Sequence, residues 1–334
     1  MMLAPPQLDQ LKISTSAGVF VDNVLPTIKA WRAQSDQVAL ITFVNREGTA
    51  PRPIGAQMAV SDKGESVGYI ASDCLGQAII QEAQRVIETK STELVRYGKG
   101  SKYIDLKLPC GSGIDLYFDG TVSDKLFEQM FDYQDKRQAF SLTLDVSTGA
   151  SSISANVKGT ANGFDETNSN LFHRHYLPTP RIFIAGTGLN LIYLAQFAAQ
   201  TGFETKILSH DEQACEYLQS LGLPILPQKP ASSLVEQYTD PYTAAVIMFH
   251  DHDLEGPILM PLLESDCYYI GAMGSKTTHE NRLLVLQSQG VSEANLARLK
   301  GSIGTLPTCK NPPQMALSIL TEVMQDAQQR NLIC

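Results

Sequence analysis

The chain has 334 residues, of which 43% are hydrophobic and 18% charged, and its formal net charge is −9. This composition is typical of a globular protein with room for two domains. The acidic balance and the lack of a Lys/Arg cluster argue against a nucleic-acid partner or an anionic membrane surface, since both need a basic face. No apolar run approaches the roughly 20 residues of a membrane span.

Six cysteines are scattered along the chain without a CxxC pair or a framework spacing. In a chain of this length the pattern indicates reduced thiols rather than disulfides. The N-terminal stretch has neither a basic start nor an apolar core and does not read as a signal peptide. We therefore expect a cytoplasmic protein with no membrane span.

The first part of the chain is predicted to be a mixed α+β domain over 1–160, because strand-like runs outnumber helical ones. In chain order, hydrophobic spacing predicts a helix over 20–34, a strand over 38–44, a hairpin over 57–72, a helix after Cys74, strands over 103–108 and 114–118, a helix over 127–133, and a hairpin over 140–157.

A stiff loop precedes the first hairpin. Pro51 and Pro53 fix φ, while Gly48 and Gly55 allow positive φ, so the loop can be rigid without belonging to a helix or a sheet. Arg52 lies between the two prolines. A stiff loop suits a guanidinium that is to be held ready for an anion.

Cys74 is predicted to stand at a helix N-terminus, where the helix dipole favours the thiolate that reactive and metal-binding cysteines use. Cys110 lies in a second glycine-rich turn. One interpretation is that both are small buried hydrophobes, and the other is that they share a thiolate site near Arg52. The neighbouring carboxylate of Asp73 should raise the pKa of the Cys74 thiol and oppose the dipole.

The stretch 161–180 is polar, rich in Asn, Gly and Pro, and without periodicity, so it is predicted to be a linker. It contains His173 and His175, which we interpret as solvated residues rather than metal ligands.

The remaining residues, 181–334, alternate between strand-like and helical patterns, which predicts a parallel sheet and a Rossmann-like domain. The predicted strands are 181–185, 203–208, 244–249 and 268–272, and the predicted helices are 189–200, 211–220, one from 253, 278–289, 293–300 and 312–328.

Gly186 and Gly188 flank Thr187 at the place of a Rossmann phosphate turn, after a strand and before a helix. The third glycine position is the bulky Leu191, and the first acid after the next strand, Asp211, comes late for binding a ribose. The pattern therefore indicates the fold more strongly than a bound dinucleotide.

The sequence His250-Asp251-His252-Asp253 follows a predicted strand, at the edge where open α/β sheets place their sites. His250 or Asp251 could serve as a general acid/base or as a polar ligand. Alternatively, Asp253 caps the next helix and His250 bonds to backbone. A zinc site is not favoured.

Gly274, Ser275 and Lys276 form a turn between a predicted strand and a predicted helix. Free N–H groups there, with the Ser275 hydroxyl and the Lys276 ammonium, would suit a phosphate. The alternative is an ordinary glycine turn in which Ser275 caps the helix.

Taken with these residues, the chain resembles the XdhC/CoxI family, the accessory factors of xanthine and carbon monoxide dehydrogenases. In the first part the resemblance rests on GTAPRPIGAQMAV, on Cys74 with its helix, and on the Cys-Gly pair at Cys110. In the second part it rests on PRIFIAGTG, on the strand ending in HDHD, on YIGAMGSK with RLLVLQSQGVSEANLARL, and on PPQMALSILTEV.

The resemblance implies a maturation chaperone rather than a catalyst. Such a protein binds molybdenum cofactor (molybdopterin), assists its sulfuration with a cysteine desulfurase, and delivers it to a xanthine dehydrogenase-type apo-enzyme. We also expect the protein to form a homo-oligomer, namely a homodimer. Cys74 is the expected metal ligand, and the expected cofactor-binding residues are Cys74, Arg52, Cys110, Gly55, Gln57, Asp73, Gly186, Gly188, His250, Asp251, Gly274, Ser275 and Lys276.

Three departures from the family pattern leave two alternatives open. The usual Ser-Gly-Gly-Cys-Val-Glu is ASDCLG around Cys74, GAGH is GTGL at Gly186, and Ser209 stands where an Asp ends the second strand. One alternative is an NAD(P)-dependent oxidoreductase that uses the Gly186 turn, with His250 or Asp251 as acid/base. The other is a degenerate partner-binding protein without a ligand.

Overall fold

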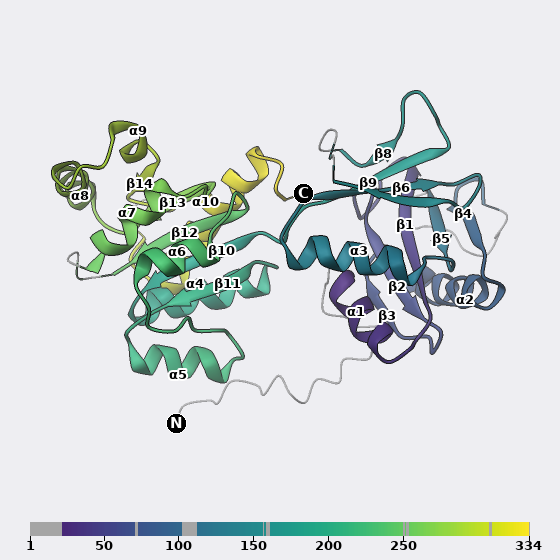
Figure 1. Cartoon of the computed structure of the whole chain (residues 1–334), viewed down its shortest axis with the longest axis horizontal. Coiled ribbons are helices and arrows are strands. Elements are labelled where there is room, and N and C mark those ends of the chain that lie inside the picture. The colour runs from purple at the N-terminus through teal and green to yellow at the C-terminus, as the bar shows by residue number, and fades with distance from the viewer. Residues whose placement is uncertain are drawn as a thin grey trace. The chain divides into compact units, whose positions relative to one another are not determined.

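The structure is a computed structural model that describes residues 22–70, 73–101, 112–155, 157, 161–249, 251, 254–306 and 309–333, with the backbone alone for 73 and 74. The chain forms two compact units, the first ending at Pro178 and the second beginning at Thr179 (Figure 1).

The first unit contains two antiparallel sheets. One has the order β3-β2-β1-β5-β4 and the other the order β7-β6-β9-β8. Their strands are β1 (Val38–Glu47), β2 (Gln57–Ser61), β3 (Ser66–Gly68), β4 (Thr92–Gly98), β5 (Gly113–Asp119), β6 (Phe140–Asp145), β7 (Ser151–Ser154), β8 (Gly163–Phe164) and β9 (Leu171–Tyr176), and the helices are α1 (Leu25–Ala33), α2 (Asp73–Thr89) and α3 (Asp124–Asp135).

Both faces of the five-stranded sheet are covered, because successive side chains of a strand point to opposite faces. Ile41 and Phe43 of β1 face α2, which buries Leu75 and Ile79 against them. Leu40 faces the other way, toward α1, α3 and the second sheet. β1 is therefore apolar along most of its length, as expected for a strand that is buried on both sides.

Most predicted elements of the first unit are confirmed where the structure describes them, but two differ. β4 was not predicted. The strand predicted over 103–108 lies outside the described residues and stays a prediction. The stretch 161–180 is not a plain linker, because it contains β8 and β9, and β9 pairs with β6 along its whole length. Phe172 and Tyr176 of β9 are buried in the core of the first unit.

The second unit is a doubly wound α/β domain, which confirms the predicted Rossmann-like fold. Its strands run parallel in the order β11-β10-β12-β13-β14. They are β10 (Arg181–Gly186), β11 (Glu204–Leu208), β12 (Thr243–Met248), β13 (Tyr269–Ala272) and β14 (Leu299–Gly301), and the helices are α4 (Gly188–Gln200), α5 (Glu212–Ser220), α6 (Ala231–Tyr238), α7 (Gly256–Glu264), α8 (Lys276–Ser288), α9 (Glu293–Leu296) and α10 (Pro312–Gln329).

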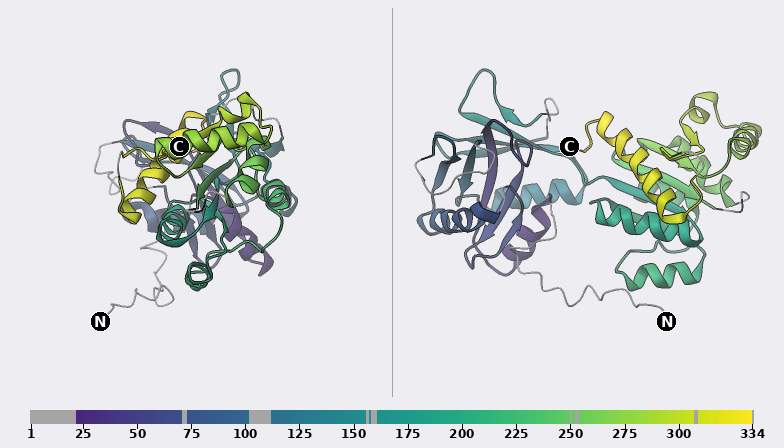
Figure 2. Two further views of the ribbon diagram at one scale, coloured as in Figure 1. Left: turned by 90° about the vertical axis from the view of Figure 1, so that its left-hand side faces the viewer. Right: turned by 180° about the vertical axis from the view of Figure 1, so that it is seen from behind.

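Ile225 forms an isolated parallel bridge to Ile207 of β11. Ile225 follows β11 and precedes β12 in the chain. If it is counted as the third of six strands, the strands have the spatial order 3-2-1-4-5-6, which is the order of dinucleotide-binding folds. Helices cover both faces of the sheet (Figures 1 and 2). α4, α5 and α10 pack on one face, and α6, α7 and one side of α8 pack on the other.

Three predictions for the second unit are corrected. The helix predicted over 293–300 ends at Leu296, because the chain then enters β14. α6 was not predicted, and α7 begins at Gly256 rather than near 253. None of the helices in the described part of the chain is long and apolar enough to cross a membrane.

Gly186 lies where β10 approaches β12, and a Cβ there would be 2.7 Å from the carbonyl oxygen of Met248. The Met248 carbonyl oxygen can move away only if the backbone of β12 shifts with it. We therefore expect Gly186→Ala to lower the free energy of unfolding by about 1–3 kcal/mol in urea titrations. Gly256→Ala is the control, since its Cβ would be 3.7 Å from the nearest atom. Equal stability of the two variants would contradict this account of the turn.

Candidate functional site

The loop between β1 and β2 is held in place, as predicted, and an asparagine fixes it. Gly55 has a φ of +91°, and a Cβ there would lie 2.4 Å from Nδ2 of Asn162. The same Nδ2 donates to the Ile54 carbonyl at 3.2 Å, and Asn162 Oδ1 accepts from the His175 amide at 2.8 Å. Glycine is therefore required at position 55 for two reasons, its positive φ and the close approach of the Asn162 side chain.

Arg52 lies on this loop and forms an ion pair with the carboxylate of Asp22. The arginine side chain is 18% exposed, while that of Asp22 is 58% exposed. Because a solvent-exposed carboxylate contributes little to such a pair, an anion with a higher charge can compete for the guanidinium. The structure thus shows Arg52 engaged with an anion, and its assignment to a cofactor stays a prediction.

Gln57 is buried, with 4% of its surface exposed. Its Nε2 donates to Thr42 Oγ1 at 3.0 Å, and its Oε1 accepts from the Tyr176 hydroxyl at 2.6 Å. Burial raises the pKa of Tyr176 to about 12, so the phenol remains a donor at neutral pH. Gln57 joins β1, β2 and β9 in this conformation, with its side chain facing the interior, and a role toward a cofactor stays a prediction.

Cys74 is the second residue of α2, which confirms its predicted place at a helix N-terminus. Its side chain, like that of Asp73 and all of Cys110, lies outside the described residues. Two residues after Cys110, Ser112 lies against the start of the loop, since a Cβ on Gly48 would be 3.4 Å from its Cβ. Ser112, the first described residue after Cys110, therefore lies against the loop that bears Arg52.

The packing also links this loop to α2. Ala50 of the loop and Leu75 of the first turn of α2 belong to one hydrophobic cluster, on the α2 side of the five-stranded sheet. The loop and the helix N-terminus are thus supported by one core.

The Gly186 turn has the geometry of a phosphate turn but is occupied from within the chain. Gly188 has a φ of +70°, and its N–H donates to Asp211 Oδ2 at 2.9 Å. The other carboxylate oxygen of Asp211 caps α5 by accepting from the Ala214 N–H at 3.1 Å. These bonds lower the pKa of the Asp211 carboxyl, with Ala214 as the larger cause. Leu191, at the third glycine position, is fully buried in the core.

After β12, the structure describes Asp251, which is exposed, while His250, His252 and Asp253 lie outside the described residues. Glu255, further along the same segment, is 1% exposed and was not singled out in the sequence. Its carboxylate accepts from Arg282 of α8 in a bidentate pair, at 2.6 Å from Nε and 3.0 Å from Nη2. This buried pair joins the segment after β12 to α8.

The turn after β13 shows the capping that one interpretation predicted. Ser275 Oγ accepts from the Thr278 N–H at 3.1 Å, and Gly274 has a φ of +147°. Lys276 is the first residue of α8 and is exposed. Capping by Ser275 is therefore confirmed, whereas anion binding stays a prediction at this point.

The two histidines of β9 have structural partners. His175 Nδ1 is 2.6 Å from Ser141 Oγ, and His173 Nδ1 is 3.0 Å from Thr143 Oγ1. Within the described part of the chain, no group of three or more His, Cys, Asp or Glu side chains is arranged to hold a metal ion.

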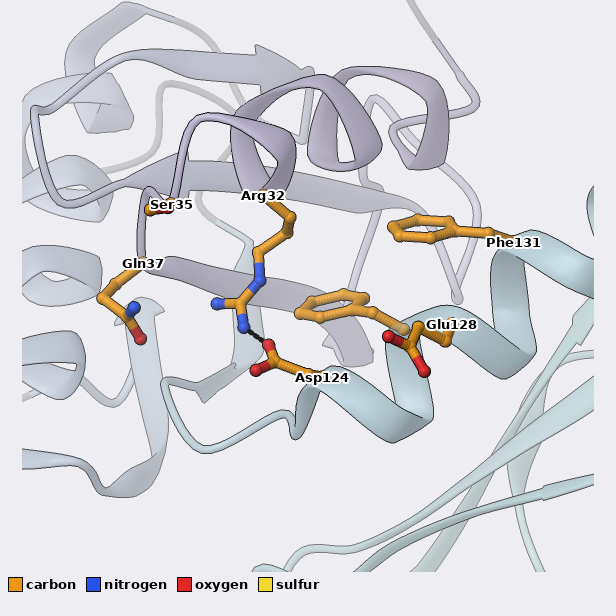
Figure 3. A pocket seen from close by; sticks show the side chains of 7 residues that line it. Arg32, Ser35, Gln37, Asp124, Glu128 and Phe131 are labelled. Atoms are coloured by element: carbon orange, nitrogen blue, oxygen red, sulfur yellow. Dashed lines mark ion pairs between the residues drawn. The ribbon is translucent and has the colours of Figure 1, made fainter.

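A pocket of about 360 Å³ lies between α1 and α3 in the first unit. Figure 3 shows Arg32 of α1 and Asp124 of α3 pointing toward each other across it, and the two form an ion pair. The Arg32 guanidinium also lies 5.7 Å from the centre of the Phe127 ring. Among the side chains that the structure describes, none that was predicted to bind a cofactor lines this pocket.

The Asp211 carboxylate offers a pH-dependent test. Its pKa is lower in the folded chain, so its contribution to stability is complete above the unfolded value and is lost as the pH falls below about 4. We expect Asp211→Ala to lower the free energy of unfolding by about 1 kcal/mol at pH 7, from the loss of a helix cap. The difference from wild type should shrink at pH 3, and an undiminished difference in urea titrations would contradict the charge-based part of this account.

Comparison with known proteins identifies the family. The XdhC and CoxI family model matches residues 31–98, and the XdhC Rossmann domain model matches 182–323. Over 284 residues the chain is 30% identical to the molybdenum cofactor insertion chaperone PaoD of Escherichia coli (strain K12), covering 85% of this chain and 81% of that protein.

Two further matches span both units. The chain is 23% identical to a probable xanthine dehydrogenase component of Bacillus subtilis (strain 168), over 87% of this chain and 93% of that protein. A crystal structure of a xanthine dehydrogenase from Bacillus halodurans has the same fold, with a TM-score of 0.72, 22% identity, and coverage of 92% of this chain and 96% of that one. The chain therefore belongs to the XdhC and CoxI family.

Proposed function

We propose that this chain is a molybdenum-cofactor accessory protein. It binds the cofactor as cargo, assists its sulfuration together with a cysteine desulfurase, and delivers it to a xanthine dehydrogenase-type apo-enzyme. The observation that carries the proposal is the 30% identity to a molybdenum cofactor insertion chaperone over most of both chains. A cytoplasmic location and a homodimeric state are part of the same proposal.

The chemistry of the cargo fits residues of the first unit. Molybdenum in this cofactor is bound by sulfur, and soft thiolates are ligands of choice for such a centre. Cys74 lies in the first turn of α2, where the helix dipole stabilises a thiolate. We assign to Cys74 the contact with the metal end of the cargo.

The phosphate end of the cargo needs a cationic donor. Arg52 lies on a loop that is fixed by Asn162 and supported by the core beneath α2. A pre-positioned guanidinium loses little entropy on binding an anion, which favours affinity. Asp22, its present partner, is exposed and is the group that the cargo would displace.

The alternative of an NAD(P)-dependent oxidoreductase gains no support from the Gly186 turn. The Gly188 N–H already binds the Asp211 carboxylate, and a diphosphate placed there would meet a like charge. The alternative of a partner-binding protein without a ligand makes the opposite prediction in the experiment that follows.

Anaerobic loading with molybdenum cofactor should distinguish the thiol of Cys74 from the other thiols. We expect wild type to retain molybdenum and pterin through gel filtration, and Cys74→Ala to retain less by at least about tenfold, because a metal ligand is lost. Metal analysis and pterin fluorescence provide the readout.

Cys309→Ala is the matched control, because Cys309 is a half-buried free thiol of the second unit. It should retain cofactor as wild type does. Equal retention by Cys74→Ala and wild type would remove Cys74 from the site, and no retention by wild type would contradict the proposed function itself.

A further inference from the structure

We propose that the second unit binds the phosphate group of a small phosphorylated ligand at the N-terminus of α8, and not at the Gly186 turn. The proposal does not rest on the cofactor chemistry of the first unit. It rests on the donors around the first turns of α8.

The first N–H groups of a helix have no acceptor within the helix. In α8, Ser275 Oγ accepts from the Thr278 N–H, and the His279 N–H bonds to the Ser275 carbonyl. The N–H groups of Lys276 and Thr277 have no such acceptor among the described residues. The exposed ammonium of Lys276 forms no ion pair with a described side chain and adds a positive charge at the positive end of the helix dipole.

Arg282 supplies an independent indication of a ligand. It is 7% exposed, and its Nη2 donates to the Met273 carbonyl at 2.7 Å. The same Nη2 would lie 3.4 Å from a Cβ on Gly274, so the guanidinium lies against the turn that leads into α8. Nη1 is buried and has no hydrogen-bond partner among the described residues. The guanidinium is paired with Glu255 through Nε and Nη2, and it thus keeps one buried donor for which a further acceptor is missing.

His279 lies three residues after Lys276 and three before Arg282, so it is a neighbour of each along α8. Its Nδ1 is also buried and lacks a partner in the described part of the chain. Burial lowers the pKa of this imidazole, and the charge of Arg282 lowers it further, so the ring is neutral at pH 7 and one of its nitrogens can donate. Three side chains and two backbone donors thus lie within the first two turns of α8.

The described charged groups at this end of α8 are Lys276 and Arg282, which are positive, and Glu255 and Glu280, which are negative. Glu255 is paired with Arg282, and the charge of Glu280 opposes the lowering of the His279 pKa, while Lys276 forms no ion pair with a described carboxylate. At α4, by contrast, the Asp211 carboxylate binds the Gly188 N–H and repels a second anion. Both helices begin at the carboxyl edge of the sheet, where open α/β folds bind ligands, so the anion is directed to α8.

Calorimetric titration of the full chain with inorganic pyrophosphate at low ionic strength tests the proposal. We expect binding to wild type, and Lys276→Gln to weaken it by roughly tenfold through the loss of a charge-assisted bond. Lys125→Gln is the matched control, an exposed lysine of α3 whose change removes the same net charge from the protein. It should leave the affinity within about twofold of wild type.

Asp211→Asn separates the two helix ends. It should leave pyrophosphate binding unchanged if the anion lies at α8. Stronger binding in Asp211→Asn together with no loss in Lys276→Gln would place the anion at the Gly186 turn and overturn the proposal, as would the absence of binding to folded wild type.

Two further titrations identify the source of the phosphate. If ADP binds more tightly than pyrophosphate and Lys276→Gln weakens the binding of ADP, the ligand is a nucleotide. If released molybdopterin displaces pyrophosphate, the ligand is the phosphate of the pterin. Cys74→Ala should bind pyrophosphate as wild type does, so a failure of the first-unit proposal is distinguishable from a failure of this one.

Discussion

The N–H groups at the start of a helix must find acceptors, and the way in which this chain provides them decides where it can bind an anion. At α4 and α5 one carboxylate, that of Asp211, serves both helices and closes the glycine turn. At α8 a neutral hydroxyl serves one N–H, Arg282 is paired with Glu255, and the Lys276 ammonium forms no ion pair with a described side chain. A fold shared with dinucleotide-binding domains is thus biased against its usual phosphate turn by a single side chain.

In the first unit the corresponding constraint is rigidity. Gln57 links β1, β2 and β9 inside the core, and Asn162 fixes the loop that carries Arg52. Because the same core supports Ala50 of the loop and the first turn of α2, a guanidinium and a cysteine are held on one frame without belonging to the same element. Such an arrangement suits a protein that must hold a fragile cargo and release it, since little has to reorder on binding.

The sequence was sufficient for the parallel sheet of the second unit and for most strands of the first, because hydrophobic periodicity reports burial directly. It was insufficient for β9, whose sequence LFHRHY reads as polar. The two histidines of β9 are satisfied by Ser141 and Thr143 of β6, about thirty residues away, and no local pattern shows such partners.

The same limit applies to the sites. Asp211 looked like a late ribose ligand, and only the fold shows that it binds Gly188. Glu255 and Arg282 lie 27 residues apart and carried no signal beyond their charges, yet they form a buried pair. The positions of Cys74 at a helix start and Ser275 at a helix cap were predictable, because both depend on their immediate neighbours.

The most direct test of the central claim, that the first unit holds the cofactor, is hydrogen–deuterium exchange of the full chain with and without molybdenum cofactor under anaerobic conditions. The account predicts slower exchange in peptides that cover the Arg52 loop and the first turns of α2. Slowing confined to peptides of the second unit, or no slowing anywhere while cofactor stays bound, would contradict it.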